Sequence, residues 1–286
     1  MSAASSGSER FGARLAKAVA ARGPLCAGID PHPGLIEAWG LPVDVSGLER
    51  FALSATEVLA AHTAIVKPQS AFFESFGAAG VRVLERVVET AREAGALVLL
   101  DVKRGDIGST MAAYAAAYVA EGAAIAADAI TVSPYLGFGS LAQCAETAVS
   151  AGRGIIVLAR TSNPEAAAVQ NAKLPDGRTV AQAIVDEVAA FNDGAGPLGD
   201  VGVVVGATVP PGELDLSRLN GPVLAPGFGA QGATVADLRA LFGSGLPGVL
   251  PASSRDILKH GPEQAALRQA VERVAEVLAD PQENDQ

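Results

Sequence analysis

Four charged side chains, Asp101, Lys103, Arg104 and Asp106, follow directly after an apolar run at residues 96–100. The run has the length and character of a buried strand, and side chains two positions apart on a strand point to the same face. Asp101 and Lys103 should therefore project together. Buried charges are costly unless they pair, and a nearby carboxylate favours the charged form of an ammonium group, which can donate a proton. The spacing favours a catalytic site over the alternative, a surface turn with a salt bridge.

Eight short apolar runs recur along the chain, separated by segments with helical periodicity. Residues 81–91 place apolar side chains on one helical stripe, and residues 111–118, 181–191 and 264–277 behave similarly. This alternation predicts a parallel sheet covered by helices, and eight units indicate a (β/α)8 barrel; a doubly wound sheet is the alternative. The runs are residues 25–29, 64–66, 96–100, 129–132, 154–158, 201–205, 222–225 and 248–250.

A single barrel domain accounts for residues 1–286, because no linker, repeat or low-complexity block divides the chain. Residues 1–8 and 280–286 are polar and predict tails at the two ends. Residues 162–178 combine Asn-Pro, Pro and Asp-Gly signals, which predict an extended loop after the fifth strand.

The composition argues against several classes of function. A net charge of −10 disfavours a nucleic-acid partner, and 5% aromatic residues are too few for base-stacking platforms. Cys26 and Cys144 are isolated, which fits a reducing compartment, and the 3 histidines are scattered, so we expect no metal centre. The polar start lacks the apolar segment of a secretory signal, and no run is long enough to span a membrane. We therefore expect a cytoplasmic protein.

Polar residues end most of the predicted strands, which is where barrel enzymes carry their chemistry. Each such residue alone is more often a solvated loop residue. Two lysines and two aspartates that meet at the same end of the barrel are harder to explain as unrelated surface residues, so we predict that they form a functional site. The strand-end residues are Asp30, Lys67, Asp101, Lys103, Ser133, the glycine segment at 227–232, Ser253, Ser254 and Arg255.

Gly227, Gly229 and Gly232 match the spacing of a dinucleotide fingerprint, but their position argues against one. The fingerprint follows the first strand of its unit and needs an acidic residue about 20 positions later. Residues 246–253 contain none. Barrels often bind phosphate between the loops after strands seven and eight. We therefore predict a phosphate site with a bidentate contact from Arg255; the alternative is a plain turn with a solvated arginine.

These segments resemble the orotidine 5′-phosphate decarboxylase family, and within it the longer bacterial subgroup (type 2). The resemblance runs from Gly28 to Asp256 and is most specific in DVKRGDIGST at residues 101–110. It implies a ribulose-phosphate-binding type of (β/α)8 barrel that acts as a homodimer and converts orotidine 5′-phosphate to UMP and CO₂. It also implies that no metal or organic cofactor is needed. The supporting segments are VKPQ at 66–69, TVSPYLG at 131–137, VGAT at 205–208 and APGFGAQG at 225–232.

The resemblance implies a role for each matching residue. Lys103 is similar to the proton donor to C6 of the pyrimidine, and Lys67, Asp101 and Asp106 complete an alternating network of charges. Asp106, with its neighbours Ile107 and Thr110, corresponds to residues that act in the neighbouring subunit's site. The implied substrate contacts are Asp30 for the ribose, Ser133 for the pyrimidine, and Gln231 (on a closing loop) and Arg255 for the phosphate, with Gly229 and Ser254 beside them.

Two positions depart from the wider family. Gly108 stands where many members have proline, and Ser254 stands where many have glycine before the arginine. The second difference leaves open which backbone amides bind the phosphate.

Two other functions remain open at this point. A sugar-phosphate decarboxylase or hexulose-phosphate synthase on a similar barrel shares the Asp-x-Lys-x-x-Asp element but acts on an enediolate held by Mg²⁺. A non-catalytic nucleotide-binding protein is the third possibility, although binding alone has no use for a proton donor such as Lys103.

Overall fold

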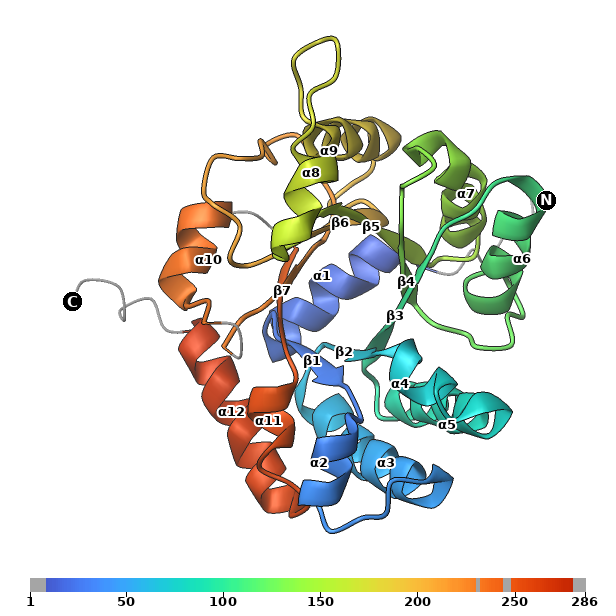
Figure 1. The fold of residues 1–286 in the computed structure, drawn as a ribbon, viewed down its shortest axis with the longest axis vertical. Helices are drawn as coiled ribbons and strands as arrows, with labels where there is room; N and C mark the ends of the chain where they lie inside the picture. Colours follow the sequence, from blue (N-terminus) through green and yellow to red (C-terminus); the bar gives the residue numbers. More distant parts are fainter. Residues whose placement is uncertain (1–8, 230–231, 244–247, 280–286) are drawn as a thin grey trace, which may run out of the picture.

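Eight parallel strands close into a barrel in which each strand pairs with the next and β8 pairs with β1. The computed structural model describes residues 9–229, 232–243 and 248–279. Helices surround the strands (Figure 1), so the predicted (β/α)8 barrel is confirmed and the doubly wound alternative is wrong. The strands are β1 Cys26–Ile29, β2 Ile65–Pro68, β3 Leu97–Arg104, β4 Ala129–Val132, β5 Gly154–Arg160, β6 Val201–Val205, β7 Val223–Pro226 and β8 Val249–Ser253.

The longer covering helices each bury one apolar face. In α5, for example, Leu84, Val87, Val88 and Ala91 of the predicted apolar stripe are buried, while the polar residues between them face solvent. The helices are α1 Phe11–Arg22, α2 Pro33–Ala38, α3 Val45–His62, α4 Ser70–Glu74, α5 Gly77–Glu93, α6 Gly108–Tyr118, α7 Ala142–Ser150, α8 Ala167–Gln170, α9 Val180–Phe191, α10 Val235–Phe242, α11 Arg255–Leu258 and α12 Gln264–Ala279.

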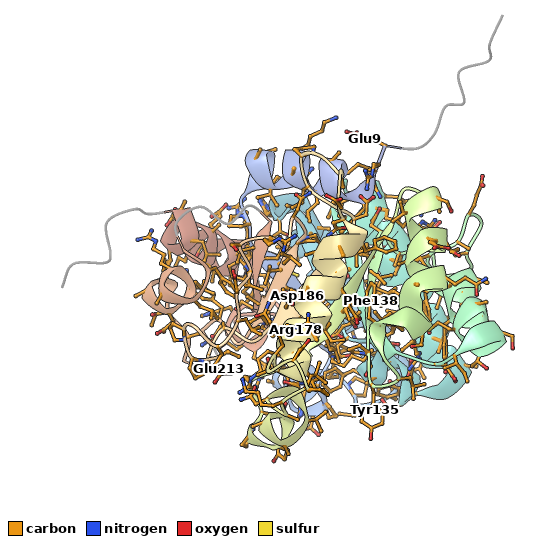
Figure 2. The ribbon with its side chains drawn as sticks, turned by 90° about the horizontal axis from the view of Figure 1, so that it is seen from above. Glu9, Tyr135, Phe138, Arg178, Asp186 and Glu213 are labelled. Carbon is orange, nitrogen blue, oxygen red and sulfur yellow. The ribbon has the colours of Figure 1, made fainter. Side chains whose placement is uncertain are left out.

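Helix α1 closes the end of the barrel where the strands begin. Phe11 and Leu15 are fully buried in the apolar cluster that fills the barrel interior. Arg14 pairs with Asp128, just before β4, at 2.5 Å, and the amide of Gly12 donates to Asp200, just before β6, at 2.8 Å. Figure 2 shows Glu9, next to α1, and Tyr135, after β4, at opposite ends of the molecule. The opposite end of the barrel, where the strands end, is not closed by α1 and is available for a functional site.

Strand β3 carries an inward row that changes from apolar to charged along its length. Leu97 and Leu99 pack in the barrel interior, whereas Val98, Leu100 and Val102 pack outward against the helices. The strand alternation then directs Asp101 and Lys103 inward, at the end away from α1. The fold therefore brings these two charges into the mouth of the barrel.

Several strands extend further than the apolar runs indicate. β3 continues to Arg104, β2 to Pro68, β5 to Arg160 and β8 to Ser253. The charged residues that the sequence analysis placed after the strands, such as Lys67 and Asp101, therefore lie within them. The apolar criterion ended these strands too early, because polar side chains at the barrel mouth find partners across the sheet.

The segment 162–178, expected as an extended loop, is partly helical. A 3₁₀ turn at Pro164–Ala166 leads into α8, and Lys173 pairs with Thr179. Pro164 stands at the first position of the turn, where proline is well tolerated, and alanines with high helix propensity follow it.

Within residues 9–229, 232–243 and 248–279, no helix has the length and apolar character needed to cross a bilayer. The polar tails expected at residues 1–8 and 280–286 lie outside the described residues.

Candidate active site

A cavity of about 380 Å³ opens at the carboxyl ends of the strands. Its volume falls in the range usual for small-molecule sites, and its position is where barrel enzymes carry their chemistry. The cavity has an apolar floor beneath a polar rim. The polar residues that line it are Asp30, Lys67, Gln69, Asp101, Lys103, Thr131, Thr161, Ser162, Asn163, Ser253, Ser254 and Arg255.

Two lysines and two aspartates form a continuous row of alternating charge across three strands. The ammonium nitrogen of Lys67 lies 3.2 Å from Oδ2 of Asp101 and 3.9 Å from Oδ1 of Asp30. On the other side, Nζ of Lys103 lies 2.6 Å from Oδ1 of Asp101. The predicted convergence of these four residues is confirmed, and the Lys103 amine points toward the acid rather than away from it.

Asp101 is the centre of this row, and two neutral side chains hold it as well. Gln69 donates to its Oδ2 at 2.9 Å, and the hydroxyl of Thr131 donates to its Oδ1 at 2.7 Å. The sequence analysis did not select Gln69 or Thr131, although both stand in segments that it noted. Each carboxylate oxygen of Asp101 thus accepts two hydrogen bonds, one of them from a lysine.

Mutual charge keeps the buried members of the row ionised. Burial alone would lower the pKa of Lys67, but the carboxylates of Asp30 and Asp101 outweigh it and hold this pKa above its ordinary value. Burial would likewise raise the pKa of Asp101, but Lys67 and Lys103 hold it far below its usual range. Both groups are therefore charged at neutral pH.

Lys103 combines a strained backbone with an accessible ammonium group. Its φ of 45° lies in the left-handed region that residues with a side chain rarely adopt. The hydroxyl of Thr131 accepts a hydrogen bond from its backbone amide at 3.0 Å. Its side chain is 47% exposed, against 8% for Lys67 and for Asp101. Of the two lysines in the row, Lys103 is therefore the one whose ammonium group a ligand in the cavity can reach.

Several polar atoms on the cavity wall form no hydrogen bond within the protein. Oδ1 of Asp30 and the hydroxyls of Ser253 and Ser254 are buried without a hydrogen-bond partner in the structure. The side chain of Arg255 is exposed at the rim, and no hydrogen bond or ion pair joins its guanidinium to the part of the chain that the structure describes. Buried polar groups are normally satisfied, so these atoms indicate ligand contacts.

Asp106, Ile107 and Thr110 do not reach the cavity of their own chain. Asp106 accepts a hydrogen bond from the amide of Ile107 at 2.8 Å, and Ile107 is 62% exposed. Thr110 is exposed at the start of α6. These residues face outward, as residues that act at a neighbouring subunit would.

Two of the other predicted contact residues do not line the cavity. Ser133 does not line the cavity; its amide donates to the carbonyl of Arg104 at 2.7 Å, because β4 still pairs with β3 at this point. Gly229 lies beyond the lining residues Gly227 and Phe228, with a φ of 75°. Gln231 lies outside the described residues.

Thr161, Ser162 and Asn163, at the end of β5, line the cavity and were missed. Helix α8 holds this wall, because Gln170 accepts a hydrogen bond from the amide of Thr161 at 2.8 Å. Their position directly after a predicted strand could have identified them. The Asn-Pro signal instead indicated an ordinary loop.

The two carboxylates of the cavity, Asp30 and Asp101, form ion pairs with lysines. Among the described residues, no group of three or more His, Cys, Asp or Glu is placed to hold a metal ion.

The pattern of the orotidine 5′-phosphate decarboxylase / HUMPS family matches residues 23–270. The protein named orotidine 5′-phosphate decarboxylase in Salinispora arenicola is 61% identical over 266 residues, which cover 93% of this chain and 96% of the relative. The protein of the same name in Streptomyces coelicolor is 55% identical over 269 residues, which also cover 93% of this chain and 96% of the relative. A crystal structure from Streptomyces avermitilis superposes with a TM-score of 0.91 and 55% identity, covering 94% of this chain and 95% of that one.

We predict that Asp101→Asn lowers the free energy of unfolding by about 3 kcal/mol at pH 7, because it leaves the buried ammonium of Lys67 without its nearer carboxylate. The folded-state pKa of Asp101 lies below the unfolded value of about 4. Its carboxylate therefore stabilises the fold above that pH, and the contribution is lost as the pH falls toward the folded-state pKa.

Urea unfolding between pH 7 and pH 2 measures both effects, and the variant should lose stability less steeply in acid than the unchanged protein. Asp176→Asn, which alters an exposed ion pair with Arg178, is the control and should change little. An Asp101→Asn variant as stable as the unchanged protein at pH 7 would contradict the prediction.

Proposed function

This chain belongs to the orotidine 5′-phosphate decarboxylase / HUMPS family, and we propose that it removes CO₂ from orotidine 5′-phosphate with Lys103 as the proton donor. The reaction yields UMP and is a step of pyrimidine biosynthesis. One observation carries the assignment to Lys103: the row of alternating charge ends in this accessible ammonium group inside the cavity. The alternative, a magnesium-dependent sugar-phosphate decarboxylase or hexulose-phosphate synthase, is not favoured, because the relatives that match over nearly their whole length are named orotidine 5′-phosphate decarboxylase.

The reaction breaks the bond between C6 and the carboxyl group and leaves the electron pair on C6. That pair is poorly delocalised into the ring, so a fixed cation beside C6 stabilises the developing charge. Lys103 then transfers a proton to C6, becomes neutral and recovers its proton from solvent. The carboxylate of Asp101 accepts a hydrogen bond from the amine of Lys103 and directs this amine into the cavity.

Lys103 alone does not account for the rate that such an enzyme needs. One ion pair at about 4 Å contributes roughly 4 kcal/mol at an effective dielectric constant near 20. Enzymes lower their barriers by about 8–23 kcal/mol. Binding of the phosphate far from C6 supplies part of the difference when it holds the ring in place and closes the loops around it.

The opposite rim of the cavity suits the phosphate and the ribose. The guanidinium of Arg255 has no hydrogen-bond or ion-pair partner among the described residues, and the hydroxyls of Ser253 and Ser254 are unsatisfied beside it. We assign these groups to the phosphate, together with Gln231, whose role the family resemblance implies. Asp30 has an unsatisfied oxygen one residue after β1 and is assigned to the ribose hydroxyls.

We further propose a homodimer in which Asp106, Ile107 and Thr110 complete the partner's site. These residues face away from their own cavity, and Ile107 follows β3, which pairs with β4. The loop after β4 carries two more exposed apolar side chains, Tyr135 at 81% and Leu136 at 53%. Tyr135 projects from the site end of the molecule (Figure 2). Exposed apolar side chains on the loops after β3 and β4 suit an interface at the mouth of the barrel.

We predict that Lys103→Ala keeps the fold and lowers kcat by at least about 1,000-fold, the value of one buried charge contact. The fall in absorbance of orotidine 5′-phosphate on mixing with purified protein measures turnover. Lys17→Ala, which removes an exposed amine on α1, is the control and should remain fully active. Substantial decarboxylation by Lys103→Ala would refute the proton-donor role, and loss of activity with a chelator in the unchanged protein would favour the magnesium-dependent alternative.

Replacement of Arg255 should act mainly on substrate binding. We expect Arg255→Ala to raise KM about 10- to 100-fold, which is the effect of losing a charge-assisted hydrogen bond to phosphate. Steady-state kinetics give the result, with Arg268→Ala on α12 as an exposed arginine control. An unchanged KM and kcat would exclude the phosphate contact.

Mixing of two inactive variants tests the shared site. Lys103→Ala and Asp106→Ala subunits that exchange freely form mixed dimers, each with one site that has both native residues. An equal mixture should therefore recover about a quarter of the activity of the unchanged protein. If the mixture stays inactive while mixed dimers are detected by mass spectrometry, Asp106 does not act across the interface.

A further inference from the structure

Arg104 follows Lys103 directly but points to the opposite side of β3, away from the cavity. Its guanidinium forms a close ion pair with Glu74 of α4 and donates to the hydroxyl of Tyr118 at 3.3 Å. It also lies over the rings of Tyr114, at 5.6 Å, and Tyr118, at 6.0 Å. Helices α4 and α6 thus hold one side chain between them.

The partner of Arg104 is itself fixed. The hydroxyl of Ser70 donates to Glu74 at 2.6 Å within α4. This helix begins directly after Gln69, which binds Asp101 and forms an isolated bridge with its backbone. Arg104 therefore ties the end of β3 to the segment that already holds the central carboxylate of the site.

The backbone between these two anchors is irregular. Pairing of β3 with β4 shifts register between Leu100 and Arg104 and resumes where Arg104 pairs with Val132. The carbonyl of Arg104 accepts a hydrogen bond from the amide of Ser133 at 2.7 Å. Lys103, with its φ of 45°, lies inside this irregular stretch. A residue stays in such a conformation only where its surroundings determine it on both sides.

We propose that Arg104 is a positioning residue for the decarboxylation, an inference that rests on the proposed function. Asp101 and Thr131 fix Lys103 on one side, and the anchored guanidinium of Arg104 fixes the next residue on the other. Arg104 thereby holds the left-handed turn that aims the Lys103 amine at the cavity. It touches neither the cavity nor the substrate.

This role differs from that of a general stabilising ion pair in what it predicts for kinetics. A displaced Lys103 amine affects the chemical step, because small misplacements of a catalytic group cost about 100-fold in rate. It leaves the phosphate contacts intact, so KM should change little. A purely structural ion pair would lower stability without this division between kcat and KM.

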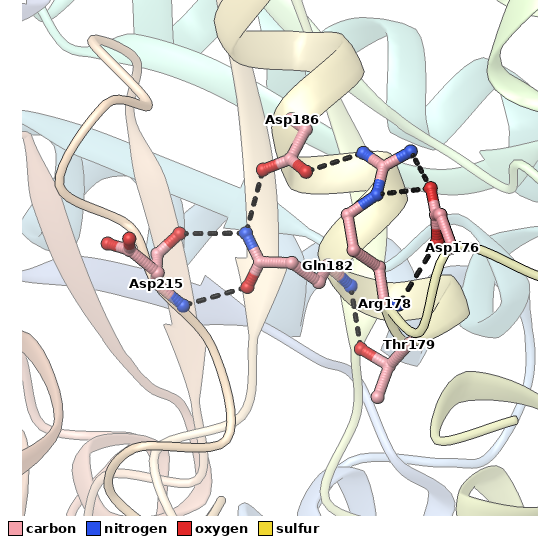
Figure 3. Close-up of polar contacts among 6 residues, drawn as sticks. All are labelled: Asp176, Arg178, Thr179, Gln182, Asp186 and Asp215. Carbon is pink, nitrogen blue, oxygen red and sulfur yellow. Dashed lines mark hydrogen bonds and ion pairs between the residues drawn. The ribbon is translucent and has the colours of Figure 1, made fainter. Parts of the chain in front are cut away.

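The test compares Arg104→Met with Arg178→Met. Arg178 also pairs with carboxylates, those of Asp176 and Asp186, but it does so on α9 and the preceding loop, outside the residues that line the cavity (Figure 3). We expect Arg104→Met to lower kcat about 100-fold with less than a threefold change in KM, and Arg178→Met to leave both unchanged. A kcat within threefold of the unchanged protein would overturn the proposal.

Two further variants guard against misfolding as the explanation. Glu74→Gln should reproduce the loss of kcat, and the double variant with Arg104→Met should be no slower than Arg104→Met alone, because both act through one contact. Additive losses, or a loss of kcat that merely follows the fall in thermal midpoint across the variants, would refute the positioning role.

A readout independent of turnover separates this proposal from the proposed function. Reductive methylation followed by peptide mass spectrometry measures how fast each lysine amine reacts. In Arg104→Met the amine of Lys103 should leave Asp101 and react several times faster, while Lys67 stays protected. A faster reaction in a protein that does not decarboxylate orotidine 5′-phosphate would overturn the function and keep the positioning role, whereas an unchanged rate would overturn the positioning role.

Discussion

The site depends on one carboxylate, Asp101, placed between two ammonium groups. Charges at this depth are tolerated only because each has a partner of opposite sign at hydrogen-bond distance. The same low-dielectric surroundings that make an unpaired charge costly also make a paired one effective on a ligand. The arrangement therefore serves stability and chemistry together, since the contact that secures Asp101 also directs the amine of Lys103.

The barrel separates these charges from the groups that close its other end. Along β3 the inward residues run from Leu97 and Leu99 to Asp101, so one strand passes from core to site. At the opposite end, α1 fills the interior with Phe11 and Leu15 and satisfies the buried Asp128 and Asp200. Substitutions at the mouth can thus alter chemistry while the packing below them remains.

The outward side of β3 also makes specific contacts. Arg104 and the loop that follows it face two helices and the solvent, where Ile107 is exposed. The short element from Asp101 to Thr110 therefore has three faces: one toward the cavity, one toward α4 and α6, and one that we assign to a second copy of the chain. The segment contains many charged residues because each of its three faces contacts a different partner.

The sequence alone determined the eight-unit alternation, the inward pairing of Asp101 with Lys103 and the convergence of Lys67 and Asp30, because strand periodicity and strand order are local patterns. The family resemblance then supplied roles for those residues. Only the tertiary structure decided that Ser133 is a backbone partner of Arg104, that Thr161 to Asn163 form a wall of the cavity, and that Gln69 and Thr131 hold Asp101. Such contacts depend on the register between neighbouring strands and on the irregular backbone at Lys103, which are set by packing across the barrel and leave no periodic signal in the chain.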